Sequence, residues 1–283
     1  MSSPNAPLPI PLGAPYKLVQ ARHGWFLANP NDFYLGRAML EYGEYGEIES
    51  AFLRQLLFKP GRIVEVGANI GTHTVGLAKE AAARGWSLDA FEPQPFIFQN
   101  LCANLALNGI ANARAWPLAC GNEAKTVFFS PPDYGAIGNF GGVEMTTEAA
   151  DNRIAVPCVR LDDLLGPAPV GLMKIDVEGF ELLVLQGAAA ILERSRPILY
   201  VENDRLEKSR DLIEFLWSMN YRLWWHGPQL FNPDNFFKVT ENIYGNVISI
   251  NMFCIPRELE AQVNSSPEVT DSAFHPMANS EGA

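Results

Sequence analysis

The sequence predicts a doubly wound α/β fold, in which helices cover both faces of a mostly parallel, Rossmann-like sheet. Two observations carry this prediction. Short apolar runs alternate with stretches of helical length between residues 62 and 220, and this alternation is typical of parallel βαβ units. The first apolar run, residues 62–66, also ends directly in a glycine-rich turn, as the first strand of such folds does.

The elements follow from hydrophobic periodicity. The helix expected at 95–107 shows the pattern well, because Phe98, Leu101, Cys102 and Leu105 recur at three- and four-residue spacing. Right-handed crossovers between the strands would make the sheet doubly wound. We expect strands at 62–66, 86–91, 113–118, 171–176, 197–202, 221–225 and 247–255, and helices at 72–84, 95–107, 181–192 and 206–220.

The 283 residues have room for one large α/β domain with tails. We expect a proline-rich extended arm at 1–15, a single domain at 16–260 and a disordered tail at 261–283, where periodic apolar residues are few. Residues 121–165 break the alternation and predict an insertion, with a hairpin near 125–129, a glycine-rich loop and a strand at 154–160. This insertion is either a substrate-binding element or a surface elaboration.

Composition excludes several classes of partner. The net charge of −11 disfavours nucleic acid and anionic membranes, and no apolar stretch is long enough to span a bilayer. The four cysteines are scattered singly, without the spacing of metal ligands, so we expect no metal site. The first residues lack the pattern of a secretory signal, and we therefore expect a cytoplasmic protein.

The strongest motif is EVGANIGTHT, residues 65–74, directly after the first expected strand. Gly67 and Gly71 allow the turn to approach a ligand, and the next helix presents its N-terminal amides. Tight packing also selects glycine, so the motif needs support from other residues. Glu92 supplies it, because an acid after the second strand of such a sheet is placed to accept the hydroxyls of a ribose.

Dinucleotides and S-adenosylmethionine both fit this geometry. The GxGxxG pyrophosphate fingerprint is absent, because Asn69 stands at its middle glycine. Glu65 would repel a pyrophosphate but suits the cationic amino-acid end of S-adenosylmethionine. The spacing therefore favours the sulfonium cofactor.

A second motif, LMKIDVEGFELLVLQGA, covers residues 172–188. Asp176 and Glu178 flank the carboxyl end of the fourth expected strand, and Val177 between them points the other way, so both carboxylates can face one cleft. Glu178 is alternatively a cap for the helix that begins near Gly179. A third candidate, His226, is expected on a loop at the edge of the sheet.

These residues resemble the FkbM family of S-adenosylmethionine-dependent methyltransferases. EVGANIGTHT is similar to its first motif, residues 90–109 to its second and MKIDVEGFELLVLQGA to its fourth-strand motif. The resemblance implies a class I methyltransferase sheet and methyl transfer to a hydroxyl of a saccharide or secondary metabolite. It also places cofactor contacts at Glu65, Gly67, Asn69, Gly71 and Glu92, and the other candidate cofactor-binding residues are Ala68, Thr72, Thr74, Pro93, Cys120 and Asp176.

Methyl transfer from a sulfonium is an in-line displacement that needs alignment and exclusion of water but no metal. We expect Asp176 and Glu178 chiefly to orient cofactor and acceptor, and His226, if it reaches the acceptor, to take its proton. Alternatives are N-methylation of a peptide or amine, a nucleotide-dependent oxidoreductase and a non-catalytic binding module. We expect acceptor selection to involve the loop at 133–143.

Overall fold

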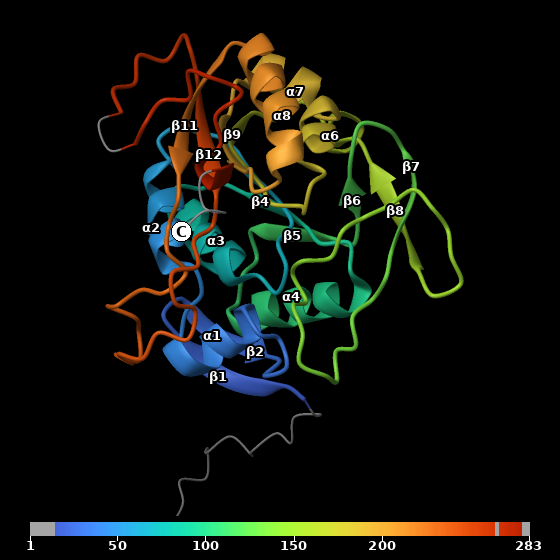
Figure 1. Ribbon diagram of the computed structural model, residues 1–283, viewed down its shortest axis with the longest axis vertical. Helices are drawn as coiled ribbons and strands as arrows, with labels where there is room; N and C mark the ends of the chain where they lie inside the picture. The colour runs from blue at the N-terminus through green and yellow to red at the C-terminus, as the bar shows by residue number, and fades with distance from the viewer. Residues whose placement is uncertain (1–14, 264–265, 279–283) are drawn as a thin grey trace, which may run out of the picture.

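A seven-stranded sheet forms the centre of the computed structural model, which describes residues 15–263 and 266–278 (Figure 1). Strand β12 runs antiparallel to both of its neighbours, β10 and β11, and the other pairs are parallel. The order is β11-β12-β10-β9-β3-β4-β5. The strands are β3 (Arg62–Val66), β4 (Leu88–Phe91), β5 (Ala113–Trp116), β9 (Val170–Ile175), β10 (Ile198–Glu202), β11 (Tyr221–His226) and β12 (Asn251–Pro256). The doubly wound prediction is confirmed.

Helices cover both faces of this sheet, as expected. Every residue of β4 and of β9 is buried, because a parallel strand with helices on both sides has no solvent-exposed face. The predicted helices near 72–84, 95–107 and 206–220 are present as α3 (Thr72–Ala83), α4 (Pro95–Leu107) and α8 (Leu206–Ser218).

The single helix expected at 181–192 is instead two, α6 (Glu181–Gln186) and α7 (Ala189–Ser195). The break has a local cause in Asp162, which follows the first residue of the short helix α5 (Leu161–Leu164). Its carboxylate accepts the backbone N–H groups of Ala190 and Ile191, and its own N–H donates to the carbonyl of Gly187. Asp162 therefore caps α7 from outside, and the chain starts a new helix there.

A hairpin and two helices that periodicity did not predict precede the first central strand: β1 (Lys17–Ala21), β2 (Gly24–Ala28), α1 (Leu35–Tyr42) and α2 (Glu47–Gln55). The hairpin docks on a row of asparagines spaced four residues apart on and just after α4. Asn108 accepts from the N–H of Trp25, Asn104 accepts from that of Leu27, and Asn100 donates to the carbonyl of Leu27. Side chains thus satisfy the free edge of β2.

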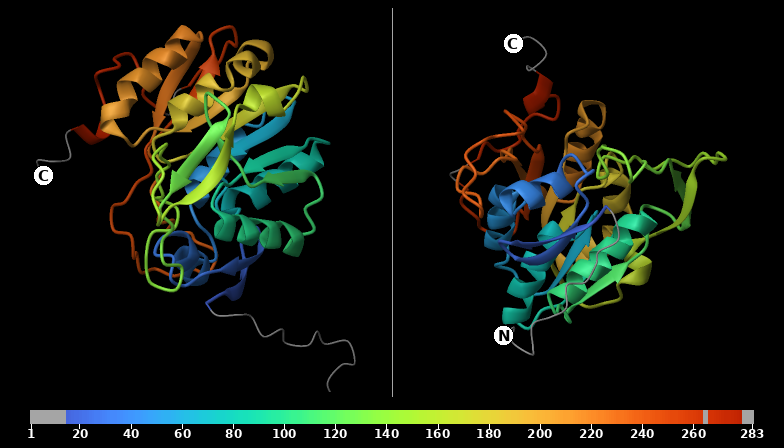
Figure 2. Two further views of the ribbon diagram at one scale, coloured as in Figure 1. Left: turned by 90° about the vertical axis from the view of Figure 1, so that its right-hand side faces the viewer. Right: turned by 90° about the horizontal axis from the view of Figure 1, so that it is seen from below.

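The insertion forms a small sheet of its own beside the central sheet (Figure 2). The strands of this small sheet are β7 (Lys125–Phe129) and β8 (Ile154–Val159) of the insertion and β6 (Ala119–Cys120), which directly precedes it. The expected strand at 154–160 is present, but there is no local hairpin near 125–129, because β7 pairs antiparallel with β8. The glycine-rich connection between β7 and β8 returns to the central sheet, where Gly141 and Gly142 line the cavity described below.

Within the tail that we expected to be disordered, residues 266–278 instead pack against β11, and residues 264–265 and 279–283 lie outside the described residues. The N–H of Val269 donates to the carbonyl of Leu223 at 2.8 Å, and that of Trp225 donates to Pro267 at 3.1 Å. Polar composition concealed this segment, since few apolar residues anchor it. The expected arm at 1–15 lies almost wholly outside the described residues. Among the described residues 15–263 and 266–278, no helix combines the length and apolar character that crossing a membrane requires.

Candidate active site

Two adjoining cavities lie at the carboxyl ends of β3 and β9, where the strand order of the sheet reverses. The larger one has a volume of about 260 Å³ and the smaller one about 50 Å³. Five residues line both cavities and form the wall between them: Gly67, Glu92, Gly141, Asp176 and Glu178. The switch point of an open α/β sheet is where such folds bind their ligands.

The glycines of the first motif are required by neighbouring protein atoms. Gly67 has a φ of 85°, and a Cβ there would overlap the carbonyl oxygen of Asp176. Gly71 has a φ of 88°, and its Cβ would lie 2.8 Å from a methyl group of Leu101. Packing against protein atoms thus accounts for both glycines, and Gly67 in addition lines both cavities.

Glu92 holds the loop after β3 in place. Its two carboxylate oxygens accept the N–H groups of Asn69 at 3.0 Å and Gln94 at 2.9 Å. The residue is 3% exposed, and burial raises its pKa to about 7. Each carboxylate oxygen has a second lone pair, so Glu92 retains capacity to accept hydrogen bonds from a ligand in either cavity.

The predicted cofactor residues divide into four groups. Gly67, Glu92 and Asp176 line both cavities, Ala68, Asn69 and Thr72 line the larger one only, and Pro93 and Cys120 line the smaller one only. The walls of the smaller cavity also include the apolar side chains of Leu118, Val143, Met145, Val177 and Phe180. Burial raises the pKa of the Cys120 thiol, which keeps it neutral. Glu65, Gly71 and Thr74 lie outside the lining of both cavities.

Glu65 lies beneath the larger cavity and pairs in register with Lys174 of β9. It is 1% exposed, and burial raises its pKa to about 7 while Lys174 opposes the rise. Lys174 is equally buried and donates to Asp176 at 2.9 Å. Burial disfavours the charged form of Asp176, but the ammonium of Lys174 holds its pKa below the usual value. Asp176 is therefore an ionised, weakly basic group.

Three further carboxylates converge at the other end of the larger cavity. Oxygen atoms of Glu178, Glu202 and Asp204 all lie within 4.8 Å of one another, a spacing that also suits a divalent cation. Arg205 pairs with Glu178 at 2.5 Å and with Asp204 at 2.8 Å. The Oε2 atom of Glu202 is buried and accepts no hydrogen bond from the described residues.

The crowding of these carboxyl groups shifts their pKa values. Burial and the charge of Asp176 raise the pKa of Glu178 to about 7 and that of Glu202 well above its ordinary value. Glu178 has a positive φ of 52°, a conformation that non-glycine residues seldom adopt. The N–H groups of Val177 and Gly179 are instead accepted by Glu181, so the alternative reading of Glu178 as the helix cap is not supported.

His226 is not among the residues that line either cavity. It is the last residue of β11, paired with Asn251, and not part of a loop. Its Nδ1 atom shares a hydrogen bond of 2.9 Å with the hydroxyl of Tyr200, and its ring stacks on Phe52 at 4.2 Å. Burial lowers its pKa to about 4. The expected loop position over the cleft is thus corrected.

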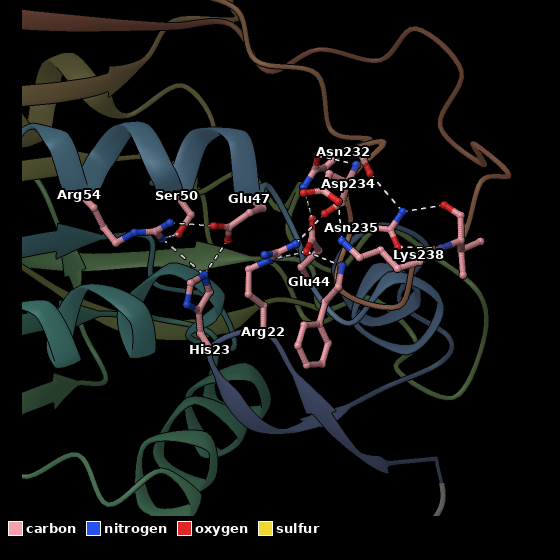
Figure 3. A network of polar contacts seen from close by, with 12 residues as sticks. Arg22, His23, Glu44, Glu47, Ser50, Arg54, Asn232, Asp234, Asn235 and Lys238 are labelled. Atoms are coloured by element: carbon pink, nitrogen blue, oxygen red, sulfur yellow. Dashed lines mark hydrogen bonds and ion pairs between the residues drawn. The ribbon is translucent and has the colours of Figure 1, made fainter.

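Residues from the N-terminal elements and the 227–250 segment close the larger cavity from above. Tyr34, Tyr45, Leu230 and Ile248 belong to this roof. The 227–250 segment is fastened through Glu44, which pairs with Arg22 at 2.6 Å and accepts from Asn232 at 2.7 Å (Figure 3).

Two lining residues that the sequence analysis did not single out, Glu49 and His73, lie 3.5 Å apart. Burial raises the pKa of Glu49 to about 7 and lowers that of His73 to about 3. His73 is therefore a neutral imidazole at physiological pH.

The strand order, the antiparallel strand β12 and the site at the switch point define a class I, Rossmann-like methyltransferase fold. Residues 65–223 match the family described as "Methyltransferase FkbM domain". The match covers more than half of the chain, which therefore belongs to the FkbM methyltransferase family.

Individual relatives agree with this assignment. The 31-O-demethyl-FK506 methyltransferase FkbM of Streptomyces tacrolimicus is 31% identical over 66% of this chain and 77% of the relative. Methyltransferase 1 of Beauveria bassiana is 28% identical over 44% of this chain and 57% of the relative. Hexuronic acid methyltransferase AglP of Haloferax volcanii is 30% identical over 46% of this chain and 50% of the relative. The matches with the last two thus span only about half of those proteins.

Proposed function

We propose that this protein transfers the methyl group of S-adenosylmethionine to a hydroxyl oxygen of a small molecule, a saccharide or a secondary metabolite. The observation that carries this proposal is the shared wall of the two cavities. It brings together an apolar cavity, the carboxylate of Glu92 and a group of further carboxylates. The cofactor has the same sequence of parts: an apolar base, a ribose and a cationic sulfonium.

The smaller cavity suits the adenine ring, because Pro93, Cys120 and Val177 offer it apolar surfaces. Glu92 stands between the cavities, where it would accept the ribose hydroxyls. The amino-acid end would then lie over Gly67 and Asn69 in the larger cavity. This pose brings the sulfonium toward Asp176, whose ionised carboxylate stabilises a positive charge.

The far end of the larger cavity is left for the acceptor. Glu178, Glu202 and Asp204 gather there, and Arg205 is the cation that pairs with two of them. An acceptor with its own negative charge would be repelled. We therefore propose a neutral hydroxyl compound, in contrast to the acidic sugar in the name of the relative AglP.

The same charges favour oxygen over nitrogen as the methylated atom. Carboxylates raise the pKa of a bound amine and keep it as an ammonium ion. An ammonium ion has no lone pair with which to attack the methyl group. A hydroxyl group keeps its lone pairs and needs only a base.

We propose Glu178 as that base, in place of His226. Glu178 lines both cavities, and its pKa of about 7 lies near physiological pH, where a general base is most effective. Arg205 holds one of its oxygens, Oε2, and leaves Oε1 for the acceptor hydroxyl. Asp176 then serves to orient cofactor and acceptor.

The test is methyl transfer from radiolabelled S-adenosylmethionine to three probes of matched size: methyl glucoside, methyl glucuronoside and glucosamine. We expect label on a hydroxyl of the neutral sugar, and little or none on the glucuronoside. Preferred labelling of the glucuronoside would overturn the acceptor class. Labelling of the amine of glucosamine would overturn O-methylation, and failure to bind S-adenosylhomocysteine would overturn the cofactor.

A further inference from the structure

Asn203 lies between two carboxylates of the site and is itself turned into the protein. Glu202 and Asp204 line the larger cavity, whereas Asn203 is 3% exposed. Its N–H donates to the carbonyl of Ile250 at 2.8 Å, and its side-chain amide donates to Ser209 at 3.0 Å. These hydrogen bonds hold Asn203 in place, and the side chains of its two neighbours extend from there into the cavity.

The carbonyl oxygen of Asn203 is held by His275, a residue 72 positions later in the chain. His275 is 1% exposed, and its Nε2 atom lies 2.8 Å from that oxygen. The N–H of Met277 donates to Nδ1 of the same ring at 3.2 Å. Nδ1 is thus the acceptor nitrogen, so the proton resides on Nε2 and His275 donates to Asn203.

Residues 266–278, here called the C-terminal strap, bring His275 to this position. The strap pairs with the edge strand β11 through Pro267 and Val269, and Glu268 binds Arg222 at 2.7 Å. The ring of His275 then packs edge to face on Trp225, with centroids 5.3 Å apart. The strap therefore connects the edge of the sheet with the back of the acceptor site.

We propose that His275 is a positioning residue for the acceptor end of the site, an inference that rests on the proposed function. The carbonyl that it binds belongs to the peptide group joining Asn203 to Asp204, so it fixes the direction in which Asp204 leaves the backbone. The carboxyl groups of Glu178, Glu202 and Asp204 lie within 4.8 Å of one another, so any two that are ionised repel each other. The hydrogen bond from His275 to the carbonyl of Asn203 helps to hold these carboxyl groups together.

Two amide substitutions that differ by one methylene separate the roles of the ring nitrogens. In His275→Gln, the amide nitrogen takes the place of Nε2 and still donates to Asn203. In His275→Asn, the shorter side chain can accept from Met277 but does not reach Asn203. Glu268→Gln is the control, because it weakens the strap at Arg222 without touching Asn203.

The first readout is hydrogen exchange in the full-length protein, followed in peptides that span residues 200–206. It needs no substrate, so it tests the positioning even where methyl transfer fails. We expect faster exchange in His275→Asn, and exchange as in the wild type in His275→Gln and Glu268→Gln. Equal exchange in all four proteins would overturn the proposal.

The second readout is kcat and KM with whichever of the three sugar probes the wild type methylates. We expect kcat to fall about tenfold in His275→Asn, the equivalent of one hydrogen bond of about 1.4 kcal/mol. Affinity for S-adenosylhomocysteine stays unchanged, and His275→Gln restores kcat to within about twofold. Equal loss of kcat in both His275 variants, or a loss of cofactor affinity in parallel, would show a merely structural role. Absence of labelling by the wild type would instead count against the proposed function.

Discussion

Lys174 of β9 and Asp176, the first residue after that strand, form an ion pair of 2.9 Å in which the lysine is buried and the aspartate opens to the cavity. The ammonium of Lys174 also lies near two more carboxylates, those of Glu49 and Glu65, which help to raise its pKa. Lys174 is 1% exposed. One lysine therefore compensates a group of acids at the floor of the site, and its removal leaves them uncompensated.

Lys174→Met should lower the free energy of unfolding by about 3–5 kcal/mol, because it leaves the buried carboxylates of Glu49 and Glu65 without their compensating cation. In the variant, the carboxylates have folded-state pKa values above their unfolded ones, so protonation favours the folded state. The deficit should accordingly shrink as the pH falls from 8 to 5 in urea titrations. Lys125→Met, which breaks the exposed pair with Glu123, should cost at most about 1 kcal/mol. A deficit that does not change with pH would contradict this account.

Gly67→Ala should destabilise the fold itself, because the added Cβ overlaps the carbonyl oxygen of Asp176. Gly85→Ala is the matched control: Gly85 also has a positive φ, of 69°, but no atom lies within 4 Å of its added Cβ. The control should lose about 1–2 kcal/mol, and Gly67→Ala clearly more, in the same urea titration. Equal losses would contradict the packing explanation of Gly67.

Glu92→Ala should weaken binding of S-adenosylhomocysteine at least tenfold. Hydrogen bonds to a charged group contribute about 1.5–3 kcal/mol each, and about 1.4 kcal/mol is tenfold. Calorimetry at pH 8 keeps Glu92 largely ionised. The control is Asp89→Asn, since Asp89 lies on β4, the strand that ends just before Glu92, but binds Arg62 and Trp116 outside both cavities. Unchanged affinity in a folded Glu92→Ala protein would remove Glu92 from the site.

Glu178→Gln should lower kcat by about 10²–10⁴, the usual contribution of a general base. A base acts in its deprotonated form, so the wild-type rate should rise with pH through the pKa of about 7 and then level off. The variant should lose that rise. His226→Gln should stay within a few-fold of the wild type at every pH. The reverse pattern, with the loss confined to the His226 variant, would restore the histidine as the base.

The central sheet could be predicted because its strands are nearly continuous apolar runs, such as residues 170–175, with glycine turns between them and the helices. The N-terminal hairpin was missed for a physical reason. Its free edge is satisfied by asparagine side chains on and just after α4, notably Asn104 and Asn108, and such long-range pairing leaves no periodic signal. The strap at 266–278 escaped notice because its burial depends on few residues, among them Val269 and His275.

The site was predicted where strand ends and glycine turns mark it, at Asn69, Glu92, Asp176 and Glu178, all of which line the larger cavity. Lys174 carried a readable signal, a lysine within an apolar strand and two residues before an acid. The roof residues come from the segments on either side of α1 and from a long loop, so only the tertiary fold brings them to the cavity. His226 was misplaced because its strand extends one residue farther than expected.

The most direct test of the central claim is a crystal structure of the protein with S-adenosylhomocysteine. We expect the adenine ring in the smaller cavity between Pro93 and Val177, both ribose hydroxyls within hydrogen-bond distance of Glu92, and the sulfur atom facing Asp176 and Glu178. A nucleoside bound outside the smaller cavity, or ribose hydroxyls that do not contact Glu92, would contradict the assignment of the two cavities.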